Sequence, residues 1–159
     1  MKRLLSTFAL ALALVLTFAA TAPAQTISFC VSLDGAQETP PVVTPGTGSG
    51  TATFDTVTKM LSLNVSYSGL VGTVTAAHIH GPAAVGVPAG IVFPLTATNP
   101  ITDTVGPLSA AQELDLLGGL YYVNIHSTFK TGGEIRGQIL GCPVPTEKST
   151  WGQVKSRYR

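Results

Sequence analysis

The sequence is poor in charged residues and in histidine, and both shortages limit what the protein can do. Lys, Arg, Asp and Glu together make up 11% of its 159 residues, and His occurs only 3 times. Between Gln25 and Thr146 three basic side chains stand against seven acidic ones, so this part lacks the basic patch that nucleic-acid binding requires. We therefore expect no nucleic-acid partner.

The sequence also lacks the motifs of several enzyme classes. It has no glycine-rich phosphate loop, no paired carboxylates suited to acid–base catalysis, and no serine or cysteine nucleophile in a recognisable motif beside a base. These absences favour a binding or structural protein over an enzyme, and we name no catalytic residue.

Long apolar runs are confined to the N-terminus. Lys2 and Arg3 precede an apolar run over residues 4–20, and Ala22-Pro23-Ala24 then offers a small-x-small cleavage motif, which is typical of a signal peptide. We expect residues 1–24 to be removed and the protein to be secreted, to the periplasm, the cell surface or the medium, with no stable membrane span left. An uncleaved anchor is the alternative, although the run is marginal in length for a membrane span.

Cysteine is scarce as well, with Cys30 and Cys142 near the two ends of the remaining chain. Export permits a disulfide, which would join the first strand to the last and contribute about 4 to 5 kcal/mol in the chain-entropy model. Two free buried thiols or a thiol metal site are the alternatives. The bridge is favoured because free cysteines in an exported protein are poorly protected from oxidation.

What the sequence has in plenty is typical of a β protein. Gly, Thr, Val and Pro are common, and short alternating runs are separated by turn residues, which predicts an all-β, antiparallel sandwich over residues 25–142. The polar and proline residues of the segment 96–107 predict a surface connection. The predicted strands cover residues 27–33, 50–56, 61–67, 73–80, 91–95, 121–128 and 134–140.

One short helix is expected after the signal peptide. Ser109 and Gln112 form a capping-box pattern, which predicts a helix over 110–117 with Leu114 and Leu117 on one face. Residues 143–159 are predicted to form a proline linker followed by a disordered tail, and a sorting or attachment tag is the alternative interpretation of that tail.

The three histidines occur on two of the predicted strands. In an extended strand His78 and His80 project on the same side, and Gly81-Pro82 ends the strand directly after them. His126 shares a side of its strand with Tyr122 and Asn124. The histidine pair therefore lies at a strand end, where loops and ligands meet.

A predicted hairpin places the strand 134–140 beside the strand that carries His126. The turn 131–133 predicts that strands 121–128 and 134–140 pair. If the register follows the apolar alternation, Asn124, His126, Glu134 and Arg136 share one polar face.

Several separate motifs together resemble one known family. From about residue 29 to 140 the chain resembles the CHRD (chordin-type) domain, with the motifs of that family in the right order. The four motifs are Gly35-Ala36-Gln37-Glu38-Thr39-Pro40-Pro41, Ala76-Ala77-His78-Ile79-His80-Gly81-Pro82-Ala83, Tyr122-Val123-Asn124-Ile125-His126 and Gly133-Glu134-Ile135-Arg136-Gly137-Gln138-Ile139. The family includes chordin, an extracellular binder of growth factors, and single-domain bacterial exported proteins. The resemblance implies a secreted module with an unidentified extracellular protein, matrix or glycan as its partner.

The strand order up to the His-x-His segment is also similar to Cu/Zn superoxide dismutase, an eight-stranded Greek-key sandwich in which such a pair binds copper. By position His78 and His80 match the pair, and His126 matches a later ligand. The resemblance implies a Greek-key, superoxide dismutase-like or immunoglobulin-like sandwich. No further histidine exists for a bridging ligand or a zinc site, so a dinuclear centre is excluded.

Two interpretations of the histidines stay open. Three imidazoles from two strands suit one copper or zinc ion with an open position, and Asn124, Glu134 or a backbone carbonyl would orient them. Alternatively, the histidines hydrogen-bond across the polar face and brace the loop that follows them. Arg136 and Glu134 are expected to form a structural pair.

Roles are also predicted for two other side chains, Tyr122 and Glu38. Tyr122 is expected to pack under a loop. Glu38 is expected either to bond to the histidine face or to cap a turn.

Two classes of function follow from these patterns. The first is a non-catalytic extracellular module that presents its loops to a partner. The second is a mononuclear copper- or zinc-binding protein, redox active if the metal is copper.

Overall fold

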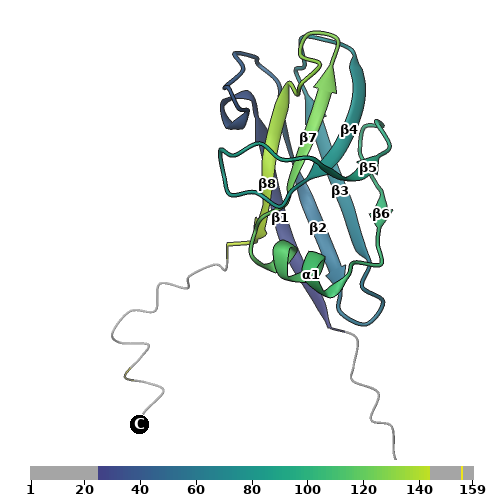
Figure 1. Ribbon diagram of the computed structural model, residues 1–159. Helices are drawn as coiled ribbons and strands as arrows, with labels where there is room; N and C mark the ends of the chain where they lie inside the picture. Colours follow the sequence, from purple (N-terminus) through teal and green to yellow (C-terminus); the bar gives the residue numbers. More distant parts are fainter. Residues whose placement is uncertain (1–24, 144–154, 156–159) are drawn as a thin grey trace, which may run out of the picture.

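The computed structural model describes residues 25–143 and residue 155. The expected signal peptide and nearly all of the expected tail lie outside these residues. The described part contains the strands β1 (Thr26–Asp34), β2 (Thr47–Asp55), β3 (Leu61–Ser68), β4 (Val74–His80), β5 (Ile91–Leu95), β6 (Thr104–Val105), β7 (Tyr122–Ser127) and β8 (Ile135–Gly141), with one α-helix, α1 (Ala110–Leu117), and a 3-10 turn at Gly35–Gln37 (Figure 1).

The strands form one curved antiparallel arrangement in the order β5-β4-β7-β8-β1-β2-β3-β6. Strand β4 follows β3 along the chain yet lies between β5 and β7, which is the crossover that a Greek-key path requires. The expectation of an all-β, antiparallel fold with one short helix is confirmed. The outer strand β5 contains Pro94, which has no N–H to offer a further strand.

The alternation of side chains explains the core. Phe29, Val31 and Leu33 of β1 are buried, and so are Leu61, Leu63 and Val65 of β3, while the residues between them face outward. The inner faces of β4, β7 and β8 add Ala77, Ile79, Val123, Ile125, Ile135 and Ile139 to the same core. This packing fixes which side of each strand faces out, because a slip by one residue would expose every apolar side chain.

The segment 96–107, predicted to be a surface connection, is buried in part and contains the short strand β6. Ile101 is fully buried and exchanges backbone hydrogen bonds with Val65, and β6 pairs with the start of β3. One buried isoleucine among polar and proline residues gives no alternating pattern, which is why the sequence did not reveal it.

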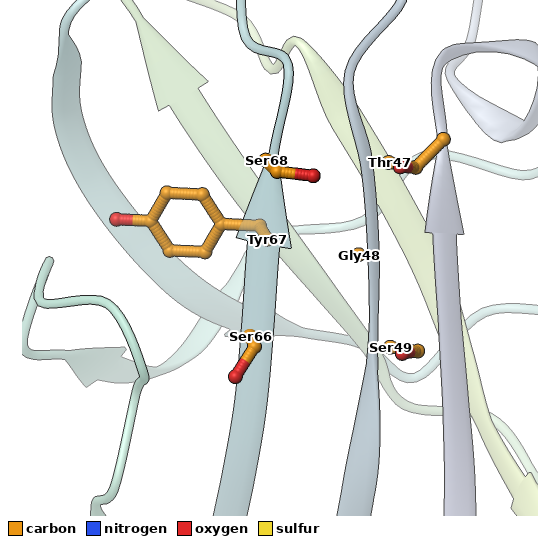
Figure 2. Close-up of a pocket in the computed structure, with 6 residues that line it drawn as sticks. All are labelled: Thr47, Gly48, Ser49, Ser66, Tyr67 and Ser68. Atoms are coloured by element: carbon orange, nitrogen blue, oxygen red, sulfur yellow. The ribbon is translucent and has the colours of Figure 1, made fainter.

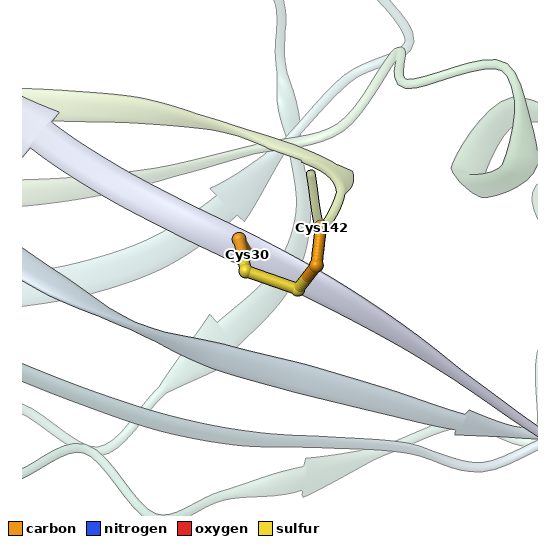
Figure 3. Close-up of a disulfide and its surroundings, with 2 residues drawn as sticks. All are labelled: Cys30 and Cys142. Atoms are coloured by element: carbon orange, nitrogen blue, oxygen red, sulfur yellow. A yellow bond between two sulfur atoms is a disulfide. The ribbon is translucent and has the colours of Figure 1, made fainter. Parts of the chain in front are cut away.

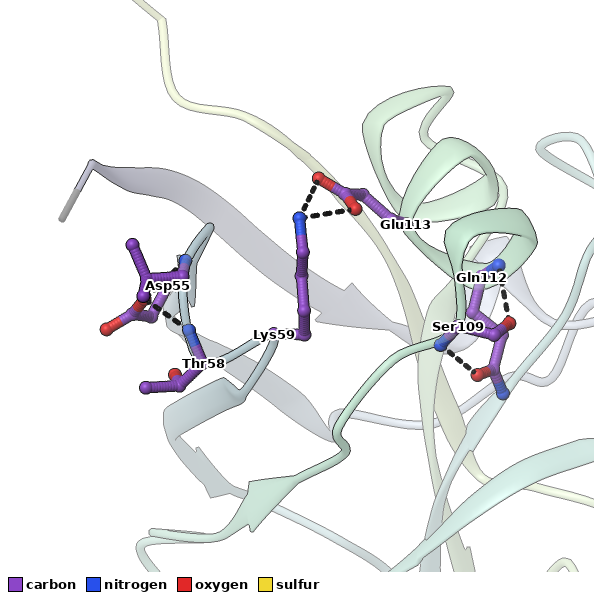
Figure 4. Close-up of polar contacts among 7 residues, drawn as sticks. Asp55, Thr58, Lys59, Ser109, Gln112 and Glu113 are labelled. Carbon is purple, nitrogen blue, oxygen red and sulfur yellow. Dashed lines mark hydrogen bonds and ion pairs between the residues drawn. The ribbon is translucent and has the colours of Figure 1, made fainter. Parts of the chain in front are cut away.

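The capping box of α1 is confirmed, since the Ser109 hydroxyl accepts from the Gln112 N–H and the Gln112 amide oxygen accepts from the Ser109 N–H. The leucine that packs into the core is Leu116, which is fully buried, whereas Leu114 and Leu117, the two expected to share a face, are exposed. Figure 4 shows the helix tied to the β2–β3 turn by Lys59, whose ammonium group lies 2.8 Å from the Glu113 carboxylate. No described helix is long and apolar enough to cross a membrane.

Cys30 and Cys142 form a disulfide, as expected (Figure 3). Cys30 lies in β1 opposite Leu140 of β8, and Cys142 directly follows β8. The bridge therefore reinforces the β1–β8 pairing that joins the two halves of the strand order.

We predict that the double variant C30A/C142A lowers the free energy of unfolding by about 2 to 5 kcal/mol, because the bridge closes a loop of 112 residues in the unfolded chain. Urea unfolding with and without a thiol reductant measures the effect. Reductant should weaken the wild type to the level of the variant and leave the variant unchanged. A wild type that unfolds equally in both conditions would contradict the prediction.

Candidate metal centre

The three histidines come together on the outer face of β4 and β7. His78 lies opposite Asn124 and Ala76 lies opposite His126 in the β4–β7 pairing, so the rings of both strands meet across the ladder. One ligating nitrogen from each of His78, His80 and His126 can be chosen so that all lie within 4.8 Å of one another. The expectation that the pair and the later histidine share a face is met in the structure.

The hydrogen-bond partners assign the protons of two rings. His80 Nδ1 lies 2.9 Å from the Ala89 carbonyl oxygen, and His126 Nδ1 lies 2.9 Å from the Thr131 carbonyl oxygen. A carbonyl only accepts, so both Nδ1 atoms carry a hydrogen and both Nε2 atoms keep a lone pair. Backbone carbonyls thus hold these rings as they commonly hold metal-ligating histidines.

The third ring completes the cluster from the solvent side. His78 Nδ1 lies 2.9 Å from His126 Nε2 and, in the absence of an ion, donates its proton there. His80 Nε2 is buried and has no hydrogen-bond partner among the described residues. A buried acceptor without a partner is costly, and a bound cation would satisfy it.

Burial lowers the pKa of His78 and of His80 below the usual value of 6.5, and the charges that neighbouring imidazoles would carry lower it further. Both rings are therefore neutral at pH 7. Neutral imidazoles are the form that binds a metal ion.

A stack of side chains supports His80 from behind. The Tyr122 ring lies nearly parallel to the His80 ring, with 5.2 Å between the ring centroids, and the Arg136 guanidinium lies over the Tyr122 ring, 3.5 Å from its centroid. The Tyr122 hydroxyl also accepts from the Ala89 N–H at 3.0 Å. Tyr122 therefore packs under the loop 81–90, as expected, and fixes both His80 and the carbonyl that orients it.

Asn124 and Arg136 lie side by side on β7 and β8, as the expected register requires. Glu134 does not join them. Its carboxylate is fully buried at the end of the sandwich, where it accepts from the Val71 and Gly72 N–H groups and from the hydroxyls of Thr44 and Ser127. The expected structural pair of Glu134 with Arg136 is therefore wrong, because Glu134 precedes β8 and does not follow its alternation.

Several groups of the site could not be found from the sequence. The carbonyls that orient His80 and His126 belong to Ala89 and Thr131, and backbone atoms carry no residue-type signal. Gly133 has φ +130°, and a side chain there would clash with Asn124 and Glu38. From the sequence, Gly133 was predicted only to belong to the turn 131–133, and its close approach to Asn124 and Glu38 was not predicted.

A separate hollow of about 430 Å³ lies on β2 and β3, lined by Thr47, Gly48, Ser49, Ser66, Tyr67 and Ser68 (Figure 2). Its lining side chains are hydroxyls with no histidine, cysteine or carboxylate. The candidate metal ligands are instead the histidines of β4 and β7.

The family model described as CHRD domain matches residues 29–139. This range includes both histidine strands and the loops that cover them. No curated protein and no solved structure matches the chain.

We predict that Glu134→Gln lowers the free energy of unfolding at pH 7 by about 1 to 3 kcal/mol, since an amide cannot accept all the buried bonds that the carboxylate accepts. Burial alone would raise the pKa of Glu134, but these hydrogen bonds outweigh it and hold the pKa below 4.5. Its stabilising effect is therefore complete above pH 4.5 and is lost as pH falls through the lowered pKa.

Chemical unfolding of the wild type and the variant at intervals of about one pH unit between pH 3 and 7 measures the difference in their free energies of unfolding. Glu113→Gln is the matched control, because its partly exposed pairing with Lys59 should contribute less than about 1 kcal/mol. Equal losses in the two variants would refute the role assigned to Glu134.

Proposed function

This chain belongs to the CHRD-domain family, and we propose that it is an exported, non-catalytic β-sandwich module that binds one copper or zinc ion through His78, His80 and His126. The observation that carries the proposal is the convergence of three imidazoles whose free nitrogens lie within 4.8 Å of one another. Imidazole nitrogens suit both metals, and three protein ligands leave a fourth position open.

The spacing of the nitrogens suits a single ion after small movements. Metal–nitrogen bonds of about 2.0 to 2.1 Å hold two ligand nitrogens roughly 3.3 to 4.1 Å apart, depending on the angle between them. The closest pair in the cluster, His78 Nδ1 and His126 Nε2, is 2.9 Å apart and would open slightly. Rotation of the half-buried His78 ring provides this movement without disturbing the two rings held by carbonyls.

Metal binding also requires the His78 ring to move its hydrogen from Nδ1 to Nε2. With an ion present, Nδ1 would become a ligand and the ring would carry its hydrogen on Nε2. The alternative in which the histidines brace the neighbouring loops is compatible with metal binding. The bonds of His80 to Ala89 and of His126 to Thr131 use Nδ1, so they persist when Nε2 is the metal ligand. The disulfide supports export, because such bonds persist in oxidising compartments.

A second function is favoured by the surface of the loop 81–90 and the residue that follows it. Val85, Val87 and Ile91 are 66%, 48% and 56% exposed, which suits contact with an extracellular protein, matrix or glycan partner. Partner binding that does not change with metal content would favour this function over the metal-binding one.

We predict that the purified protein binds about one copper or zinc ion per chain, and that His80→Ala and His126→Ala each weaken binding at least tenfold, on the order of the loss seen when a metal-site group is removed. Elemental analysis after dialysis and titration with each metal measure stoichiometry and affinity. Asn64→Ala, an exposed polar change on β3, is the control and should bind normally. Equal metal content in the wild type and both histidine variants would refute the site.

A further inference from the structure

The loop between β1 and β2 carries a buried acid that the metal site does not use. This loop, Gly35–Gly46, begins with the 3-10 turn and contains three prolines. The Glu38 side chain within it is only 7% exposed. A carboxyl group so placed must be paired, hydrogen-bonded or protonated.

Two buried acceptor oxygens lie close together beside Gly133, each without a hydrogen-bond partner among the described residues. Glu38 Oε1 and Asn124 Oδ1 are both buried, and neither has a hydrogen-bond partner among the described residues. A Cβ atom built on Gly133 would lie 2.5 Å from Glu38 Oε1 and 2.3 Å from Asn124 Oδ1, so the two oxygens are within 4.8 Å of each other, the sum of these distances. With the Asn124 amide in this orientation, the two acceptor oxygens become partners only when Glu38 carries a proton.

Charged groups face Glu38 from several elements. Arg136 of β8 attracts its carboxylate, and Lys130 of the β7–β8 turn lines the same hollow of about 230 Å³. Asp34 of β1 is engaged with Gln37, and the histidines lie on β4 and β7. The one ion pair within 4 Å among the described residues joins Lys59 and Glu113, so Arg136 lies farther than that from the Glu38 carboxylate.

Burial outweighs the attraction of Arg136. It raises the pKa of Glu38 from 4.5 to about 7, although the Arg136 charge and the Thr39 N–H act in the opposite direction. The Arg136 guanidinium is instead occupied with the Tyr122 ring and with weak bonds to Thr39 and Gln138.

We propose that Glu38 keeps its proton while the loop Gly35–Gly46 is closed and donates it to Asn124 Oδ1, so that this bond is a pH-sensitive latch over the histidine face. When pH rises, Glu38 releases one proton to solvent and the two oxygens lose their bond. The charged carboxylate then gains hydration by leaving the interior, and the loop opens.

The latch reaches the histidines through a second loop. The Thr39 hydroxyl, next to Glu38, donates to the Gly86 carbonyl at 3.2 Å. Gly86 belongs to the loop 81–90, whose Ala89 carbonyl orients His80. Opening of the latch therefore loosens a group that holds a metal ligand, a consequence that rests on the proposed metal function.

The latch itself is tested on the metal-free protein at pH 6 and pH 8. The Glu38 and Val42 amides both donate to the Gly35 carbonyl and report closure by hydrogen exchange. After correction for intrinsic exchange, opening in the wild type should increase about tenfold between these pH values, as expected for one group of pKa about 7. Glu38→Gln, whose amide donates to Asn124 at any pH, should stay closed, and Glu113→Gln should behave as the wild type.

Infrared difference spectra between the wild type and Glu38→Gln provide a second measurement. They should contain the C=O band of a protonated carboxyl at pH 6, and this band should disappear with a midpoint near pH 7. Absence of the band at pH 6, or the same pH dependence of exchange in the wild type and Glu38→Gln, would overturn the latch.

Protein loaded with copper or zinc tests whether the latch affects how firmly the metal is held. At pH 8 the wild type should release copper or zinc to a chelator faster than Glu38→Gln does, whereas at pH 6 the two should match. If neither metal binds, the proposed function fails while the exchange result still decides on the latch. Binding with equal release rates at pH 8 would overturn the link between them.

Discussion

The structure depends on one constraint, which is that the polar outer face of β7 and β8, together with His80 at the end of β4, is buried. Elsewhere in the sandwich an outward side chain meets water, but here two loops cover it, and Tyr122, Asn124, Arg136 and Gln138 are each no more than 5% exposed. Buried polar groups must find partners within the protein. The stacking of Arg136 on Tyr122 and the bonds of Gln138 to the Ala83 and Gly119 carbonyls meet this requirement. Among the described residues, His80, Glu38 and Asn124 each keep a buried polar atom without a hydrogen-bond partner, and both proposals made above start from these atoms.

The two sides of the domain therefore serve different purposes. The apolar inner faces and the disulfide between β1 and the end of β8 give a frame in which each strand has a fixed register. The outer polar face uses that frame to bring residues from distant parts of the chain together, because ladder pairing sets ring positions more firmly than loops do. The histidines come from two adjacent strands, and the backbone carbonyls that orient them come from the loops that follow those strands.

Alternation within strands was sufficient to predict the antiparallel fold, the common side of His78 and His80, and the neighbouring positions of Asn124 and Arg136. It failed where a residue lies outside a regular strand or helix pattern. Glu134 precedes β8 and turns toward the β3–β4 loop, and Ile101 is buried from an irregular segment. On α1 the buried face was missed because one leucine, Leu116, makes the contact while two exposed leucines suggested another side. Tertiary contacts decide these positions, and local sequence does not record them.

Pro94 has a consequence for the protein in concentrated solution. Strand β4, which carries the histidine pair, is bordered by β5, and β5 forms one outer edge of the strand order. An exposed edge invites strands of other molecules to add to it, which leads to fibres. Pro94, the fourth residue of this five-residue strand, interrupts its row of N–H groups. Strand β5 therefore offers fewer hydrogen-bond donors to a strand of another molecule, which protects the edge beside the histidine strand from edge-to-edge assembly.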